Sequence, residues 1–227
     1  MASIPFDVVA FDLDGTLADT APDLAASLNH TLAALGRPTV PPGSVQSLVG
    51  HGARALLRRG LALSGEAPEE LVDQGLPIFL DFYAAHICDG TLPYPGVEAA
   101  LDAIAAAGAR PALCTNKPEA LTHKLLDALG WGARFAAIVG GDTLPVRKPD
   151  PAPLFEAIAR AGGGRAAFVG DSITDADTAK AAAIPFVAVS FGFRDRPVED
   201  LGANAVIDRF DDLMHALQSL AAKEERV

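Results

Sequence analysis

Two aspartates stand two residues apart near the start of the chain, directly after an apolar run. Residues 8–11 read Val-Val-Ala-Phe, and Asp12, Leu13, Asp14 and Gly15 follow them. Residues two apart on a strand point the same way, so both carboxylates can face one site while Leu13 turns into the core. Because carboxylates are costly to crowd or bury, this pair indicates a bound cation, a proton or a substrate.

Three further segments place polar side chains after an apolar run or before a helix. They are Thr115-Asn116, Arg147-Lys148-Pro149-Asp150-Pro151, and Asp171 with Asp175. Each segment alone has an ordinary interpretation, since loops use Thr and Asn, surface lysines are usually solvated, and Asp175 could cap a helix. Together they would bring three or four carboxylates, a hydroxyl, an amide and an ammonium to one place.

Such a cluster of carboxylates needs cations to hold it. Two unit charges about 4 Å apart repel by about 4 kcal/mol at an effective dielectric constant near 20. Oxygen ligands suit Mg²⁺, and Lys148 would supply a second positive charge. A divalent ion, a lysine, a threonine hydroxyl and a spare carboxylate nucleophile are the parts that phosphoryl transfer needs.

The elements that must position these side chains alternate between strands and helices. Strands are predicted at 6–11, 110–114, 135–139, 166–169, 186–189 and 205–207, and helices at 97–107, 118–129, 151–161 and 175–183. Residues 221–226 are predicted to form a short helix that frays at the end of the sequence. Several strands are apolar throughout, which is typical of parallel strands buried on both faces. The pattern predicts an α/β fold with a doubly wound, Rossmann-like parallel sheet, whose site lies at the carboxyl ends of the strands.

One stretch interrupts this alternation. Between residue 20 and about residue 91 no strand is evident, and leucines recur at helical spacing, as at Leu24, Leu28 and Leu32. We expect a small all-helical cap domain inserted after the first strand. The predicted domains are therefore an α/β catalytic core at 1–19 and 93–227 and a helical cap at 20–92, with hinges at 20–21 and 92–95.

Composition narrows the possible partners and location. The chain has 227 residues, 50% of them hydrophobic, with a net charge of −11 and a pI of about 4.8. An acidic surface repels nucleic acids and anionic membranes, so neither is an expected partner. Cys88 and Cys114 lack the spacing of a zinc site, and no signal peptide or membrane span is evident. We expect a cytoplasmic protein, and the oligomeric state stays open.

In this order, the four segments resemble the haloacid dehalogenase superfamily of phosphotransferases, across essentially the whole chain. The resemblance implies that Asp12 attacks phosphorus to form an aspartyl-phosphate and that Asp14 acts as general acid and then as general base. It also implies that Thr115 binds the transferring phosphoryl group together with Asn116, and that Lys148 steadies nucleophile and phosphate.

The same resemblance implies a Mg²⁺ site. Asp171 and the Asp12 carboxylate would bind the metal together with the backbone carbonyl of Asp14, and Asp175 would lie beside them. The helical insert is similar to the cap that this superfamily carries after its first motif.

The substrate is predicted from the details of the motifs. An acid at Asp14 favours a phosphate ester, and Leu24 stands where mutases of the superfamily carry histidine. The cap loop with Gly50, His51 and Gly52 is the candidate for substrate recognition, because glycines let a backbone approach a small ligand.

Several stretches, including 17–24, 140–144 and 147–154, are similar to bacterial phosphoglycolate phosphatases. The resemblance implies that a small phosphorylated acid, 2-phosphoglycolate, is hydrolysed to glycolate and phosphate. Two alternatives remain: a phosphatase for another small metabolite, such as a sugar phosphate or pyrophosphate, and a non-catalytic phospho-receiver. The receiver is disfavoured by the chain length and by the helical insert.

Overall fold

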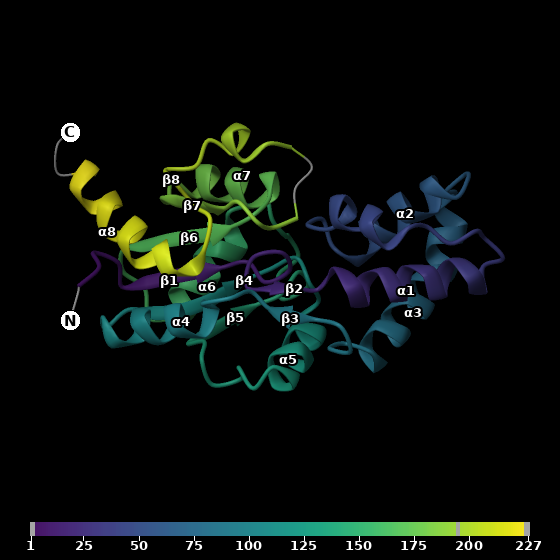
Figure 1. Ribbon diagram of the computed structural model, residues 1–227, viewed down its shortest axis with the longest axis horizontal. Helices are drawn as coiled ribbons and strands as arrows, with labels where there is room; N and C mark the ends of the chain where they lie inside the picture. Colours follow the sequence, from purple (N-terminus) through teal and green to yellow (C-terminus); the bar gives the residue numbers. More distant parts are fainter. Residues whose placement is uncertain (1–2, 194–195, 225–227) are drawn as a thin grey trace.

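One six-stranded parallel sheet forms the centre of the molecule (Figure 1). The computed structural model describes residues 3–193 and 196–224. Along the sheet the strands are β5 (Ala137–Val139), β4 (Arg110–Cys114), β1 (Val8–Phe11), β6 (Ala166–Gly170), β7 (Phe186–Val189) and β8 (Ala205–Ile207). The predicted doubly wound parallel sheet is confirmed, with β4, β7 and β8 at their predicted bounds.

Helices cover both faces of this sheet. The strands alternate their side chains, so that Val9 and Phe11 face one side while Val8 and Ala10 face the other. The first face packs against α4 (Val97–Ala106), α5 (Glu119–Ala128) and α8 (Leu213–Glu224), and the second against α6 (Ala152–Arg160) and α7 (Ile173–Ala182). Both faces of the sheet are therefore buried, as the apolar strands predicted.

Two helix predictions differ from the structure. Helix α7 begins at Ile173 rather than Asp175, because Ser172 is its N-cap and Asp175 completes a capping box. Helix α8 follows the short turns η3 (Val198–Leu201) and η4 (Phe210–Asp212), and it is much longer than the fragment at 221–226 that the sequence predicted. Residues 225–226 of that fragment lie outside the described residues.

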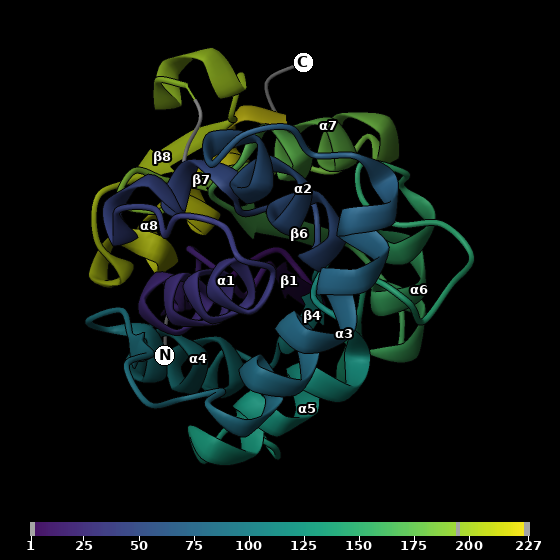
Figure 2. The same ribbon diagram turned by 90° about the vertical axis from the view of Figure 1, so that its right-hand side faces the viewer.

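The stretch between residues 20 and 91 is helical and holds no strand. It contains α1 (Ala21–Ala34), the turns η1 (Pro42–Ser44) and η2 (Gln46–Leu48), α2 (Ala53–Leu63) and α3 (Glu69–Ala85). These helices gather at one end of the molecule, on the right in Figure 1, and Figure 2 shows them in front of the sheet. We refer to residues 20–91 as the helical segment.

A two-stranded ribbon joins the helical segment to the rest of the chain. β2 (Ala18–Asp19) pairs antiparallel with β3 (Leu92–Pro93), so the chain leaves and returns at neighbouring points. Both cysteines are free, and Cys114 is buried at the end of β4. Among the described residues, no helix combines the length and the apolar character that a membrane span requires.

Candidate active site

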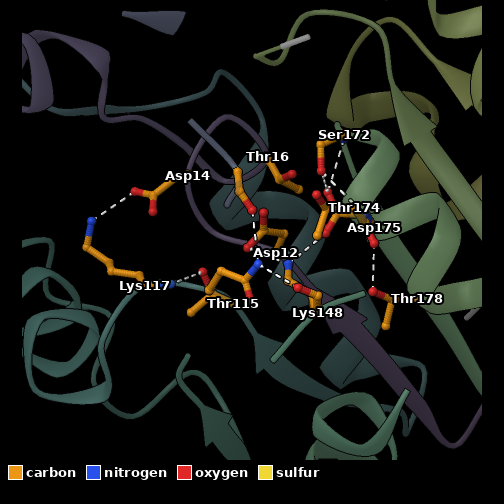
Figure 3. A network of polar contacts seen from close by, with 12 residues as sticks. Asp12, Asp14, Thr16, Thr115, Lys117, Lys148, Ser172, Thr174, Asp175 and Thr178 are labelled. Carbon is orange, nitrogen blue, oxygen red and sulfur yellow. Dashed lines mark hydrogen bonds and ion pairs between the residues drawn. The ribbon is translucent and has the colours of Figure 1, made fainter. Parts of the chain in front are cut away.

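Three polar side chains leave the sheet together because of its strand order. β1 lies between β4 and β6, and the register pairs Phe11, the last residue of β1, with Leu113 and Val169, which each precede the last residue of their strand. Asp12, Thr115 and Asp171 follow these strands and therefore emerge at one edge (Figure 3 shows the first two). All three are buried. The parallel sheet thus brings together residues that lie more than 150 positions apart in the sequence.

Lys148 reaches this edge from the segment that precedes α6. Its Nζ lies 3.0 Å from Asp12 Oδ1 and 2.6 Å from Asp175 Oδ1, and its side chain is 1% exposed. The contact with Asp175 is a hydrogen bond. Asp12 Oδ1, in contrast, has no hydrogen-bond partner among the described residues, so its contact with Lys148 is an ion pair without hydrogen-bond alignment.

Burial and neighbouring charges shift the titration of this cluster. Burial raises the pKa of Asp12 to about 6, and the charge of Lys148 opposes that shift. Burial also works against the charge of Lys148, but Asp12 and Asp175 outweigh it and raise the pKa of the ammonium. Lys148 therefore stays positively charged next to the Asp12 carboxylate.

Asp171 is held by two hydrogen bonds. Thr16 Oγ1 donates to its Oδ1 over 2.7 Å, and the backbone N–H of Phe193 donates to its Oδ2 over 2.6 Å. Burial raises the pKa of Asp171, as do the charges of Asp175 and Asp12. The Gly15 backbone passes so close that a Cβ there would lie 2.5 Å from Asp171 Oδ2, at a φ of +83°. A glycine at position 15 is thus needed for the loop to pack against Asp171.

Asp175 combines a helix-capping role with a charge contact. Its Oδ2 accepts hydrogen bonds from the Ser172 hydroxyl over 2.6 Å, from the Ser172 N–H over 3.1 Å and from the Asp171 N–H over 3.2 Å. Its Oδ1 accepts the hydrogen bond from Lys148. The capping box thereby fixes the carboxylate that in turn holds Lys148.

The carboxylates of Asp12, Asp171 and Asp175 could hold a cation. They offer oxygen atoms that lie within 4.8 Å of one another. Asp12 Oδ1 is buried and accepts no hydrogen bond among the described residues, so it can act as a ligand although Lys148 lies 3.0 Å away. An all-oxygen donor set of this kind fits Mg²⁺. The Asp14 side chain is outside this group, and its predicted backbone contact with the metal stays a prediction.

The Asp14 side chain points to a second lysine that the sequence reasoning missed. Lys117 Nζ donates to Asp14 Oδ1 over 2.9 Å and also to the hydroxyl of Tyr83, which comes from α3 (Figure 3 shows Asp14 and Lys117). The Lys117 side chain is 2% exposed. Its position directly after Thr115-Asn116 was the one available sequence signal. The contribution of Thr16 was also missed.

Asn116 links loops in this structure. Its Nδ2 donates to the carbonyl oxygens of Gly50 and Lys148, over 3.0 Å in each case. Both amide hydrogens are thus engaged, and its buried Oδ1 lacks a partner among the described residues. The predicted contact of Asn116 with a phosphoryl group stays a prediction.

The loop with Gly50, His51 and Gly52 packs against the edge of the sheet. Both glycines have positive φ values, +102° and +85°, and Gly52 is the N-cap of α2. His51 Nδ1 lies 3.3 Å from Thr174 Oγ1. Arg54, for which the sequence indicated no role, lies on the surface and pairs with Glu69 and Asp73.

A cavity lies between the helical segment and the sheet edge, next to the loop by which the two parts make contact. Its walls come from both sides and are mostly apolar: Asp12, Asp14, Thr115, Asn116, Lys117, Pro118 and Leu121 from the core, and Leu24, Val49, Gly50, Gly52, Ala53, Leu56, Phe79 and Tyr83 from the helical segment. Asp12 and Asp14 thus face a space that also contacts the glycine loop. His51 lines a separate hollow behind that loop.

The arrangement matches a known family. The sequence profile of the haloacid dehalogenase-like hydrolases matches residues 6–183. The chain belongs to this family. It is 49% identical to a phosphoglycolate phosphatase of Mesorhizobium japonicum, over 91% of this chain and 92% of that protein. It is 45% identical to one of Caulobacter vibrioides, over 93% and 91% of the two chains.

Solved structures of the family share the fold. A predicted phosphoglycolate phosphatase from Haemophilus somnus superposes with a TM-score of 0.88 at 31% identity, over 94% of this chain and 98% of that one. These comparisons confirm the family resemblance that the four motifs indicated, and they identify the chain as a phosphatase-like hydrolase.

Proposed function

We propose that the protein is a Mg²⁺-dependent phosphatase that hydrolyses 2-phosphoglycolate to glycolate and phosphate. The observation that carries the proposal is the buried Asp12 carboxylate, which lies against Lys148 and faces a cavity shared with Asp14. The names of relatives at 49% and 45% identity support the choice of substrate. A bound Mg²⁺ would be held by carboxylates of the Asp12, Asp171 and Asp175 group, and would offset the charge of the phosphoryl oxygens.

The chemistry proceeds in two displacements. In the first, an Asp12 oxygen forms a bond to phosphorus while the bond from phosphorus to the ester oxygen breaks. Asp14 gives its proton to that oxygen, so the alcohol leaves in neutral form. Lys148 favours the ionised form of Asp12 against the effect of burial, and its positive charge attracts the incoming anion. Thr115 follows β4 at the same edge, where its hydroxyl can donate to a phosphoryl oxygen.

The second displacement releases phosphate. A water molecule attacks the phosphorus of the aspartyl-phosphate, Asp14 takes a proton from that water, and the bond to Asp12 breaks. Asp14 returns to its protonated form and Asp12 to its carboxylate, which completes the cycle. The cap prediction fits this scheme, because helices over the cavity would exclude bulk water while the ester is cleaved.

The test compares Asp12→Asn with the unaltered protein. We expect the variant to lose at least about 10³-fold in kcat for 2-phosphoglycolate, because an amide cannot form the phosphoryl ester. Asp102→Asn is a matched control, since Asp102 lies on α4, away from the cavity lining, and its exposed carboxylate pairs with Arg134. Circular dichroism would verify that both variants fold. Normal turnover by a folded Asp12→Asn protein would refute the mechanism.

A panel of esters tests the substrate separately. The unaltered protein should show a higher kcat/KM for 2-phosphoglycolate than for glucose 6-phosphate or pyrophosphate. A flat profile over these compounds would refute the substrate assignment and leave the phosphatase mechanism intact.

A further inference from the structure

The lining of the cavity carries more acidic than basic side chains. Its described residues include two carboxylates, Asp12 and Asp14, and a single cationic side chain, Lys117. Lys148 contacts Asp12 but is not part of this lining. A substrate with a second anionic group besides its phosphate needs a positive partner in the cavity, and among the described lining residues Lys117 alone supplies one.

Lys117 is held in place at this position. Its ammonium has three donors, and two of them go to Asp14 Oδ1 and to the hydroxyl of Tyr83. The Tyr83 ring also lies 4.4 Å from Nζ, at cation–π distance. Burial raises the pKa of the Tyr83 phenol, so it stays neutral and does not compete as an anion. One ammonium donor thus remains without a partner among the described residues.

The contact with Asp14 fixes where that spare donor lies relative to a substrate. In the proposed reaction Asp14 contacts the ester oxygen that leaves. In 2-phosphoglycolate a single methylene separates this oxygen from the carboxyl carbon. A group that is hydrogen-bonded to Asp14 therefore lies next to the position of the substrate carboxylate.

The surroundings strengthen such an ion pair. Leu56 and Phe79 of the helical segment and Leu121 of α5 line the same cavity, and they provide no competing polar groups. An ion pair is stronger in surroundings of low dielectric constant, and a carboxylate bound there gains a charge-assisted hydrogen bond.

We propose that Lys117 is the specificity-determining residue of this site. Its spare donor binds the carboxylate of a phosphorylated 2-hydroxy acid. Tyr83 positions this lysine from α3, so the helical segment contributes to substrate choice without touching the phosphoryl group. The inference rests on the proposed phosphatase function and deepens it. It also predicts that the length of the substrate matters. An acid with a longer spacer between the ester oxygen and the carboxylate would place its charge beyond Lys117.

The test measures a ratio of specificities. Purified protein with Mg²⁺ is assayed for phosphate release from 2-phosphoglycolate and from 2-hydroxyethyl phosphate, which replaces the carboxylate with a neutral hydroxymethyl group. We expect Lys117→Met to lower the ratio of the two kcat/KM values at least about 10-fold, because it removes a charge-assisted hydrogen bond. The loss should fall mainly on KM for 2-phosphoglycolate.

A matched control and a second variant keep the test decisive. Lys124→Met removes an exposed lysine from α5, the helix that follows Lys117 in the chain, and should leave the ratio unchanged. If Lys117→Met does not fold by circular dichroism, Lys117→Gln takes its place, since it keeps a polar side chain beside Asp14. In the unaltered protein, 3-phosphooxypropionate should show a lower kcat/KM than 2-phosphoglycolate because of its longer spacer.

The outcomes separate this inference from the proposed function. If the unaltered protein prefers 2-phosphoglycolate and the Lys117 variant keeps that preference, the inference is wrong and the proposed function stands. An equal loss on both esters would also overturn it, because Lys117 would then act through Asp14 alone. If the unaltered protein shows no preference for the acidic ester, both the substrate assignment and this inference fail.

Discussion

Two buried lysines lie at the same end of the sheet, each next to an aspartate of the first motif. Lys148 pairs with Asp12 and is surrounded by groups of the α/β core. Lys117 pairs with Asp14 and reaches across to a tyrosine of the helical segment. Both ammonium groups are almost fully buried, so the two lysines differ in the parts of the molecule that they contact and not in their exposure.

This difference separates two tasks. The contacts of Lys148 lie within the core, where the phosphoryl group of any ester would bind. The contacts of Lys117 join the core to the helical segment, where we propose that the part of the substrate other than its phosphate binds. A change at Lys148 should therefore affect all substrates equally, whereas a change at Lys117 should affect them selectively.

The largest effect is expected at Lys148. Lys148→Met should lower kcat by about 10²–10³-fold for 2-phosphoglycolate and for 2-hydroxyethyl phosphate alike, because it removes a preorganised charge from the reacting group. Steady-state phosphate release measures both. Lys180→Met, at an exposed position near the end of α7, is the control. A loss restricted to the acidic ester would reverse the roles of the two lysines.

An intermediate effect is expected at Asp175, which anchors Lys148. Asp175→Asn keeps an acceptor for the helix cap but removes a charge beside the proposed metal site. The Mg²⁺ concentration for half-maximal activity should rise about 10–100-fold. Removal of Mg²⁺ with a chelator should abolish the activity of the unaltered protein and of Asp175→Asn.

Ser172→Ala separates the capping role of this region from its charge. The substitution removes the N-cap hydroxyl of α7 and should lower the free energy of unfolding by about 1 kcal/mol. Its Mg²⁺ requirement should change less than that of Asp175→Asn. Thermal unfolding measures the loss of stability, and a Mg²⁺ titration measures the Mg²⁺ requirement. An equal shift of that requirement in Ser172→Ala and Asp175→Asn would show that the helix cap, and not the charge of Asp175, governs Mg²⁺ binding.

The smallest effect is expected at Tyr83. Tyr83→Phe removes the hydroxyl that accepts from Lys117 but keeps the aromatic ring beside the ammonium. We expect a loss of about 1 kcal/mol in the free energy of unfolding and a rise of a few-fold in KM for 2-phosphoglycolate. Urea denaturation and kinetics would measure both. An unchanged KM would indicate that Asp14 alone positions Lys117.

The sequence predicted the part of the site that lies on the sheet. Apolar runs mark parallel strands, and residues that follow such strands meet at one edge, so Asp12, Thr115 and Asp171 could be placed together without a structure. Lys148 could be added because its segment follows another strand of that sheet. The same reasoning found strands β4, β7 and β8 at their bounds.

The part of the site that depends on helix docking could not be predicted. Tyr83 lies 34 residues from Lys117, on a helix whose orientation depends on how the helical segment packs. Helix α3 also runs through Pro77, a residue type that usually ends helices. The sequence predicted a helical insert here but not the bounds of this helix. Thr16 was missed because its partner, Asp171, lies 155 residues away and its hydroxyl carries no motif of its own.

The central place of β1 in the sheet has a consequence for how the molecule loses its function. Hydrogen bonds on both sides protect this strand, so the backbone before Asp12 should exchange its amide hydrogens only when the whole domain opens. The chain enters and leaves the helical segment through one short ribbon, and we expect this segment to open at a lower free energy than β1 does. In mild denaturant, discrimination between substrates should therefore fade before the capacity to cleave a phosphate ester does.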